Sequence, residues 1–166
     1  MGANSFITAC KNRQKSIIKV FLNSKKIDIN ERDDMGRTGL FYSCGEGDRE
    51  IVKLLIEAGA DVNLGDNNSI TPLHKLFKNG GDKIADMTEL LMENGADPNS
   101  KNIDGETPLM LLSNIWREEE GIEALEILEN YNVDISITNN KGETALDTAL
   151  KMKKEKLAQY LMNIGG

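Results

Sequence analysis

The chain has 166 residues, a net charge of −7 and 39% hydrophobic residues, only 5% of all residues being aromatic. No stretch approaches the ~20 consecutive apolar residues of a membrane span, and the first residues lack the basic and then apolar order of a secretory signal. These features exclude a membrane-spanning protein and predict one cytoplasmic domain with a thin, elongated core.

The negative charge is concentrated in the middle of the chain. Residues 1–30 carry six Lys or Arg and one Asp, and residues 151–166 carry four Lys and one Glu. Residues 31–150 therefore hold a net charge of −15, because the two ends contribute +5 and +3 to the total of −7. An acidic body disfavours nucleic acid as a ligand and favours a protein partner with a basic segment. The alternative is that this charge only keeps the surface solvated.

Two sequence markers recur along the chain in the same register. One is a threonine before a short apolar run, and the other is an aspartate after a longer run. Both step by 33, 36 and 37 residues, at Thr38, Thr71, Thr107 and Thr144 and at Asp28, Asp61, Asp97 and Asp134. Because two independent markers step together, the chain consists of repeats of about 33 residues, with extra residues in two copies.

Each repeat predicts a short inner helix followed by a longer outer helix. The threonine caps the inner helix, and Pro72 and Pro108 occupy its first position, where the missing N–H costs nothing. Apolar residues then fall on one face of the outer helix; in the second and third repeats they are Ile51, Leu54, Leu55, Met87, Leu90 and Leu91.

The outer helices are expected to end at a residue in the left-handed conformation. Gly59 and Gly95 suit that position, and Asn132 is the next most tolerant type in the fourth repeat. The first repeat has Lys26 there. The terminal units look like caps that close the stack against water, and the first keeps Ile7 and Ile18 together with Phe21 and Leu22 for packing. With both caps present, we expect a complete small protein.

The segments TPLH (71–74) and GADVN (59–63) resemble the ankyrin repeat, and the resemblance extends over essentially the whole chain. It implies an all-α fold, an α-solenoid of about five stacked helix-turn-helix units joined by hairpin-like loops. The units of this single domain are expected at about 1–32, 33–65, 66–101, 102–138 and 139–166.

The resemblance also implies a non-enzymatic protein that binds a partner protein on a concave surface of loop tips and inner helices. Carried over to this chain, the predicted loop-tip contacts are Asp34, Met35, Arg37, Asn67, Asn68, Ile70, Ile103, Asp104, Glu106, Asn140, Lys141 and Glu143. The inner helices add Glu46, Lys78, Asn79, Asn114 and Ile115. Met35, Ile70 and Ile103 would either form an apolar stripe across the tips or pack on neighbouring tips.

The extra residues of the third and fourth repeats lie between their two helices, around 78–86 and 114–124. Loop insertions are where binding residues gather, and the second one holds the only tryptophan, Trp116. Trp116 is either an exposed partner anchor or a side chain folded back over its own helix pair.

No enzyme signature is present in the sequence. The only histidine, His74, lies in the TPLH segment, where the resemblance implies a structural hydrogen bond that fixes the turn. Cys10 and Cys44 fall on neighbouring inner helices, too far apart for a disulfide, and are expected to be buried thiols. The run Glu118–Glu120 is typical of a solvated helix face. We therefore expect no catalytic residue, metal or cofactor.

Three functions remain open from the sequence. The first is a monomeric interaction module, and the second is a small acidic inhibitor, such as an immunity protein, that masks a basic partner. The third is a structural spacer or self-assembling subunit, with dimers through Trp116. The expected location of the protein is the cytoplasm of its own cell, or the cytoplasm of a host cell if it is delivered as an effector.

Overall fold

The computed structural model describes residues 3–166, and this part of the chain contains helices and connecting loops but no strand. The all-α fold class is therefore confirmed. In chain order the helices are α1 (Ala3–Lys11), α2 (Lys15–Ser24), α3 (Gly39–Glu46), α4 (Arg49–Glu57), α5 (Pro72–Asn79), α6 (Ile84–Glu93), α7 (Pro108–Leu111), the 3-10 helix η1 (Leu112–Asn114), α8 (Glu118–Glu129), α9 (Ala145–Lys151) and α10 (Glu155–Gly165).

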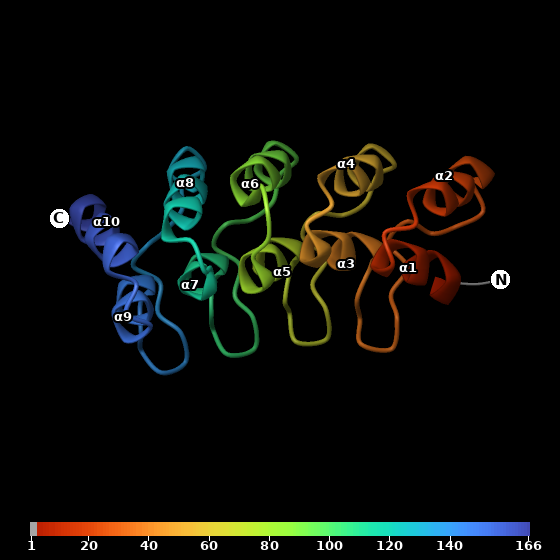
Figure 1. Cartoon of the computed structure of the whole chain (residues 1–166). Helices are drawn as coiled ribbons and strands as arrows, with labels where there is room; N and C mark the ends of the chain where they lie inside the picture. The colour runs from red at the N-terminus through yellow and green to blue at the C-terminus, as the bar shows by residue number, and fades with distance from the viewer. Residues whose placement is uncertain (1–2) are drawn as a thin grey trace.

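The helices form two parallel rows (Figure 1). The inner row is α1, α3, α5, α7 and α9, each packed on the next, and the outer row is α2, α4, α6, α8 and α10. Four long loops project from the inner row, on the side away from the outer helices. The outer helices spread apart while the loops converge, so the loops and inner helices lie on the concave side of a curved stack.

The repeated threonine precedes four of the five inner helices, and its side chain caps three of them as predicted. Thr38 Oγ1 accepts from the backbone N–H of Phe41 at 3.1 Å, and Thr71 and Thr144 make the same bond in their units. Thr107 makes no side-chain cap bond, so that prediction was wrong there. The N–H of Met110, which the cap would satisfy, donates instead to the backbone carbonyl of Thr107 at 3.2 Å.

The outer helices end in left-handed residues, with one shift from the prediction. Gly59, Gly95 and Asn132 have φ of 92°, 87° and 57°. In the first unit the left-handed residue is Lys25 at φ 51°, not Lys26, because α2 ends at Ser24 and the turn follows at once.

The predicted apolar faces form one continuous core between the two rows. Ile51, Leu55, Met87 and Leu91 are completely buried, and the helix neighbours Leu54 and Leu90 are half-buried. Burial of each such side chain contributes ~1.5–3 kcal/mol, which a single helix pair cannot obtain without its neighbours.

A row of asparagines joins the first four units to one another outside this core. We call Asn30, Asn63 and Asn99 the asparagine ladder. Their Oδ1 atoms accept from the backbone N–H groups of Asp61, Asp97 and Asp134 at 2.7, 2.8 and 2.8 Å. Asn63 and Asn99 also donate through Nδ2 to the carbonyls of Gly95 and Asn132 in the following unit, at 2.8 and 3.0 Å. The repeated aspartate therefore marks a joint between units as well as a turn.

The two insertions account for the unequal steps of the repeat. In the third unit α5 ends at Asn79 and the loop 80–83 precedes α6. In the fourth unit the inner helix has only four residues before η1, and the loop 115–117 leads into α8. The inner helix of the fourth unit therefore departs from the geometry of the other inner helices just before the second insertion.

Some apolar side chains of the first and last units remain in solvent. Ile7 and Ile18 are buried, but Val20 on α2 is 66% exposed. Leu150 and Met162 of the last unit are 55% and 45% exposed. These units therefore close the stack less completely than caps are expected to do.

Candidate functional site

The loop tips are shaped by one side chain at the base of each loop. Asp33 Oδ1 accepts from the backbone N–H groups of Met35 and Arg37, both at 2.9 Å. The equivalent oxygen in the following loops belongs to Asp66, Asn102 and Asn139. The sequence analysis missed these four positions, although they step by 33, 36 and 37 residues like the two markers. They hold the tips rigid, so the residues between them face outward in a fixed geometry.

Hydrogen bonds also join each tip to its neighbour. The backbone links run from Asn67 to Met35 (3.0 Å), from Ile103 to Asn68 (3.1 Å) and from Asn140 to Asp104 (2.9 Å). The side-chain amides of Asn67 and Asn140 add bonds to the carbonyls of Asp34 and Ile103. Two predicted contact residues, Asn67 and Asn140, therefore fix the spacing of the tips. Gly36 and Gly105, both with positive φ, let these amides approach, since a Cβ would collide with them.

The apolar tip residues do not form one stripe. Met35 and Ile103 are 51% and 58% exposed, whereas Ile70 is half-buried. The exposed polar tip of Asn67 and Asn68 lies between Met35 and Ile103 in the row of linked tips. The expectation of a continuous stripe is therefore wrong, because the three residues occupy different positions in their loops.

The charged tip residues differ in how far the fold uses them. Asp34 and Asp104 are exposed, and their carboxylates have no hydrogen bond or ion pair within the part of the chain that the structure describes. Arg37 is half-buried, with its guanidinium 5.5 Å from the ring of Phe41. Glu106 accepts from Asn102 Nδ2 at 2.9 Å. The free tip charges are therefore mainly the two aspartates and Lys141.

Glu143 is held within the last loop. Its carboxylate accepts from Asn139 Nδ2 at 3.0 Å and from Lys151 Nζ at 2.8 Å, and these bonds lower the pKa of Glu143. Among the inner-helix predictions, Glu46, Lys78 and Asn114 are exposed. Asn79 is also exposed, but its Nδ2 donates to the carbonyl of Gly45 at 3.1 Å.

The two insertions lie against each other. The guanidinium of Arg117 is 3.1 Å from the carboxylate of Asp82, and Lys154 Nζ donates to the carbonyl of Ile115 at 2.9 Å. Trp116 is 92% exposed, so its side chain lies in solvent and is not folded back over its own helix pair. Ile115 is only 3% exposed, so its predicted place on the binding surface is wrong. The turn after η1 directs Ile115 into the core and the next side chain outward.

A cavity opens on the concave side between the last two units. It has a volume of about 440 Å³. Met110, Leu111 and Met152 provide its apolar lining, and the tips of the last two loops provide polar walls. A second cavity of about 220 Å³ lies between the two insertions and is lined by Trp116. Asn114 lines both cavities, so the two are adjacent.

His74 has the structural role that the resemblance implies. It is fully buried, and its Nδ1 accepts from the backbone N–H of Thr71 at 3.3 Å. Its Nε2–H therefore donates to the carbonyl of Glu106 in the next loop, at 2.8 Å. Burial lowers the pKa of His74, which keeps the ring neutral and suits these two bonds. The ring joins two units and is closed to a substrate.

Cys10 and Cys44 are free and completely buried, as predicted. Burial raises the pKa of Cys10 to about 12, and it raises that of Cys44 as well, so neither forms a reactive thiolate. Within residues 3–166 no cluster of His, Cys, Asp and Glu could hold a metal ion. In the same range no helix is long and apolar enough to cross a membrane.

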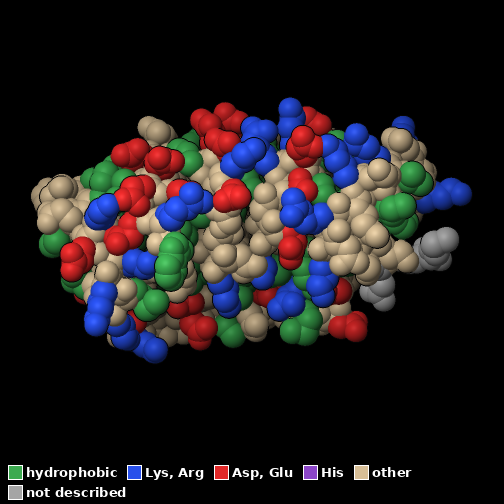
Figure 2. Space-filling model, viewed as in Figure 1, with side chains coloured by type: hydrophobic (Ala, Val, Ile, Leu, Met, Phe, Trp, Pro, Cys, Tyr) green, Lys and Arg blue, Asp and Glu red, His purple; other side chains and the backbone are tan. Residues whose placement is uncertain are grey.

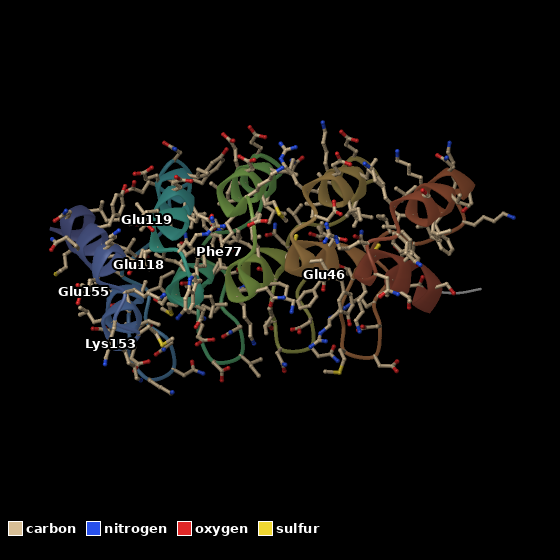
Figure 3. All side chains as sticks on the ribbon, in the orientation of Figure 1. Glu46, Phe77, Glu118, Glu119, Lys153 and Glu155 are labelled. Atoms are coloured by element: carbon tan, nitrogen blue, oxygen red, sulfur yellow. The ribbon has the colours of Figure 1, made fainter. Side chains whose placement is uncertain are left out.

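The run Glu118–Glu120 is not a simple solvated face, so that prediction was wrong. Glu118 and Glu119 lie at the start of α8, between α8 and α10 (Figure 3). Glu118 Oε2 accepts from the backbone N–H groups of Lys156 and Leu157 at 2.9 and 3.1 Å. Glu119 pairs with Lys156, and Glu120 pairs with Arg117. Glu118 therefore caps the last outer helix from the preceding unit.

Charges of both signs are mixed on the face of the molecule seen in Figure 2, without a large patch of one sign. On this face the acidic excess of residues 31–150 is thus not gathered into one patch. Local groups such as Asp34 and Asp104 are for that reason more informative about a partner than the net charge.

Known proteins resemble this chain over part or nearly all of its length. The probable 26S proteasome regulatory subunit p28 of Saccharomyces cerevisiae is 28% identical over 163 residues, which are 98% of this chain and 68% of that protein. The tyrosine-protein kinase HTK16 of Hydra vulgaris is 37% identical over 67 residues, 39% of this chain and 9% of the kinase. The human scaffold protein ILK is 30% identical over 61 residues, 37% of this chain and 14% of ILK.

The family comparison agrees with the helix pairs and linked loops. A model of three ankyrin repeats matches residues 6–102 and, separately, residues 77–166. Proteins built from such repeats are generally non-catalytic modules for protein–protein interaction. The chain belongs to the ankyrin-repeat family.

Proposed function

We propose that this protein is a non-catalytic module that binds a partner protein with the loop tips and the exposed side of the inner helices. The observation that carries the proposal is the row of linked tips, from which the side chains of Asp34, Met35, Ile103 and Asp104 project into solvent. Side chains that are held in place before binding lose little conformational entropy when a partner docks.

The charges of the free tip residues indicate the kind of partner. Asp34 and Asp104 stand beside exposed aliphatic side chains, so a partner surface with apolar anchors and basic flanks would be complementary. The names of two relatives, a proteasome regulatory subunit and a scaffold protein, agree with a role in holding or regulating other proteins.

The test compares two variants of equal charge change. Asp34→Lys/Asp104→Lys alters the tips, and Glu93→Lys/Glu126→Lys alters exposed positions on the outer helices α6 and α8. Partners are captured from the native cell with each protein, identified by mass spectrometry, and their dissociation constants are measured with purified components. We expect binding by the wild type and the outer-helix variant and a loss of about 10-fold or more for the tip variant.

A partner that binds the tip variant as well as the wild type would refute the proposed surface. If the purified partner is an enzyme or a toxin, its activity with and without this protein distinguishes an inhibitor from a recruiting module.

A self-assembling subunit is the second candidate, and the 92% exposure of Trp116 favours it. Sedimentation velocity over a range of concentrations tests it. A dimer that forms in the wild type and is absent from Trp116→Ala would support self-assembly, whereas a monomer at all concentrations would exclude it.

A further inference from the structure

The cavity between the last two units differs from the same place elsewhere in the stack. Lys75 and Thr148 hold the same position, four residues after their threonines. In the third unit Lys75 reaches back over the ring of Phe41 in the preceding unit at 5.4 Å and fills the space between the two units. In the fifth unit the shorter Thr148 faces the fourth unit at the same place, and the cavity of about 440 Å³ lies there, lined by Thr148 and by Met110, the counterpart of Phe41.

A second change adds an apolar side chain to the lining of this cavity. The residue eight positions after the threonine is Glu46 in the second unit, Asn79 in the third and Met152 in the fifth. Met152 is 48% exposed and lines the cavity together with Met110 and Leu111. Methionine side chains are flexible and polarisable, so a pocket that they line can adapt to several apolar side chains.

The polar wall of the cavity holds one free negative charge, at Asp104, and one free positive charge, at Lys141. Glu106 and Glu143 also line it, but their carboxylates accept from Asn102, Asn139 and Lys151. Asp104 has no such partner among residues 3–166. A basic group beside a bound apolar side chain would therefore find its counter-ion at Asp104.

Trp116 stands where a bound segment would leave the cavity. Asn114 lines both this cavity and the neighbouring one of about 220 Å³, which is flanked by Trp116 on one side and by the glycines of the first insertion on the other. Gly80 and Gly81 carry no side chain that would block the path. The two cavities therefore adjoin at Asn114, and we call them together the Met152 groove.

We propose that the Met152 groove binds an extended segment of the partner in which an apolar side chain lies next to a lysine or arginine. The apolar side chain enters the cavity at Met152, the basic group pairs with Asp104, and Trp116 packs over the segment beyond Asn114. This inference rests on the proposed function, because it specifies the partner chemistry of one part of the same surface.

The experiment selects peptides without assuming a partner. Random 12-residue peptides displayed on phage, encoded without tryptophan, are selected on the immobilised full chain. We expect enrichment of peptides with Leu, Met or Phe within two positions of Lys or Arg. The best peptide is then synthesised with a fluorescein label, and its affinity is measured by fluorescence polarisation.

Two methionines provide a matched pair of variants. Met152→Glu introduces a charge into the groove, and Met162→Glu introduces the same charge on α10, where Met162 is 45% exposed. We expect about 10-fold or greater weakening of peptide binding for Met152→Glu and little change for Met162→Glu. Because both positions are partly exposed, both variants should fold; circular dichroism and thermal melting check this, and Trp116→Ala provides an independent groove variant.

Two further measurements locate the peptide. The only tryptophan of the chain is Trp116, so its emission should move to shorter wavelength when a bound peptide covers it. The variant Asp104→Lys should bind the selected peptide more weakly than the wild type does. A peptide with Glu in place of its basic residue should regain affinity for this variant.

The inference is overturned if no peptide is enriched, if the enriched peptides lack the apolar and basic pair, or if Met152→Glu binds them as well as Met162→Glu does. A peptide that keeps its affinity for Met152→Glu and loses it with Asp34→Lys would place binding elsewhere on the tips. That result would refute the groove while leaving the proposed function intact.

Discussion

The asparagine ladder predicts that one exposed side chain controls the coupling between two units. Asn63→Ala removes two hydrogen bonds to the following unit, one from the N–H of Asp97 and one to the carbonyl of Gly95, both at 2.8 Å. A hydrogen bond of this kind contributes about 0.5–1.5 kcal/mol, so the free energy of unfolding should fall by about 1–3 kcal/mol.

The matched control is Asn94→Ala in the next unit. Asn94 is also exposed, but its Nδ2 donates to the carbonyl of Leu90 within its own turn at 2.8 Å. Removing one local bond should cost about 0.5–1.5 kcal/mol and leave the contact between units unchanged. Urea unfolding, followed by circular dichroism, gives both free energies and the slope that reports cooperativity.

Amide hydrogen exchange provides a local readout of the same prediction. The N–H of Asp97 should exchange faster in Asn63→Ala, while that of Asp134, which bonds to Asn99, should keep its protection. Equal protection of Asp97 in the variant and the wild type, with no greater loss of stability than in Asn94→Ala, would refute the role assigned to the ladder.

Two other predictions concern contacts between units. Because burial lowers the pKa of His74 below its ordinary 6.5, the unfolded chain binds the proton more readily than the folded chain. The stabilising effect of the neutral ring is complete above pH 6.5 and is lost as the pH falls from there toward the folded-state pKa. The free energy of unfolding should thus decrease as the pH falls below 6.5, and the variant His74→Asn should lose this dependence on pH. Equal pH slopes in the two proteins would contradict this prediction. Glu118→Ala removes the acceptor of two backbone N–H groups at the start of α10 and should cost about 1–2 kcal/mol in urea unfolding, whereas Glu123→Ala on the exposed face of α8 should cost much less. A similar cost for both glutamate variants would show that this cap contributes nothing.

The repeat and most helix ends were predictable because they depend on local chemistry. A threonine that caps a helix, a proline at its first turn and a glycine after its last turn each act within four residues, so their spacing can be read directly from the sequence. The apolar faces of α4 and α6 follow from the same local periodicity. These signals recur in register, and their agreement identified the stack.

The second insertion shows where that reasoning fails. Counting from Thr107 places Ile115 at the exposed position that Asn79 occupies in the preceding unit. The inner helix of the fourth unit, however, ends after four residues and continues as η1. The different rotation per residue of a 3-10 helix buries Ile115 and leaves Trp116 in solvent. Periodicity could not reveal this, because the change of helix type interrupts the period itself.

The role of Glu118 was hidden for a different reason. Its two hydrogen bonds reach residues 38 and 39 positions away, at the start of α10. Within its own segment the run of glutamates has the composition of a solvated surface. A contact between neighbouring units is visible only once the stack has been assembled.

The fold constrains the residue type at some loop positions and leaves other positions free. The residue five positions before each threonine is Asp33, Asp66, Asn102 or Asn139, since the tip needs a side-chain oxygen there. The residue three positions before it has no such constraint, and it is Met35, Asn68, Asp104 and Lys141 in turn. An exposed position that is rigidly held but chemically free can differ in every unit without cost to stability. Such positions, together with Met152 and the insertion that presents Trp116, are where the choice of a partner can be encoded independently of the stack that displays it.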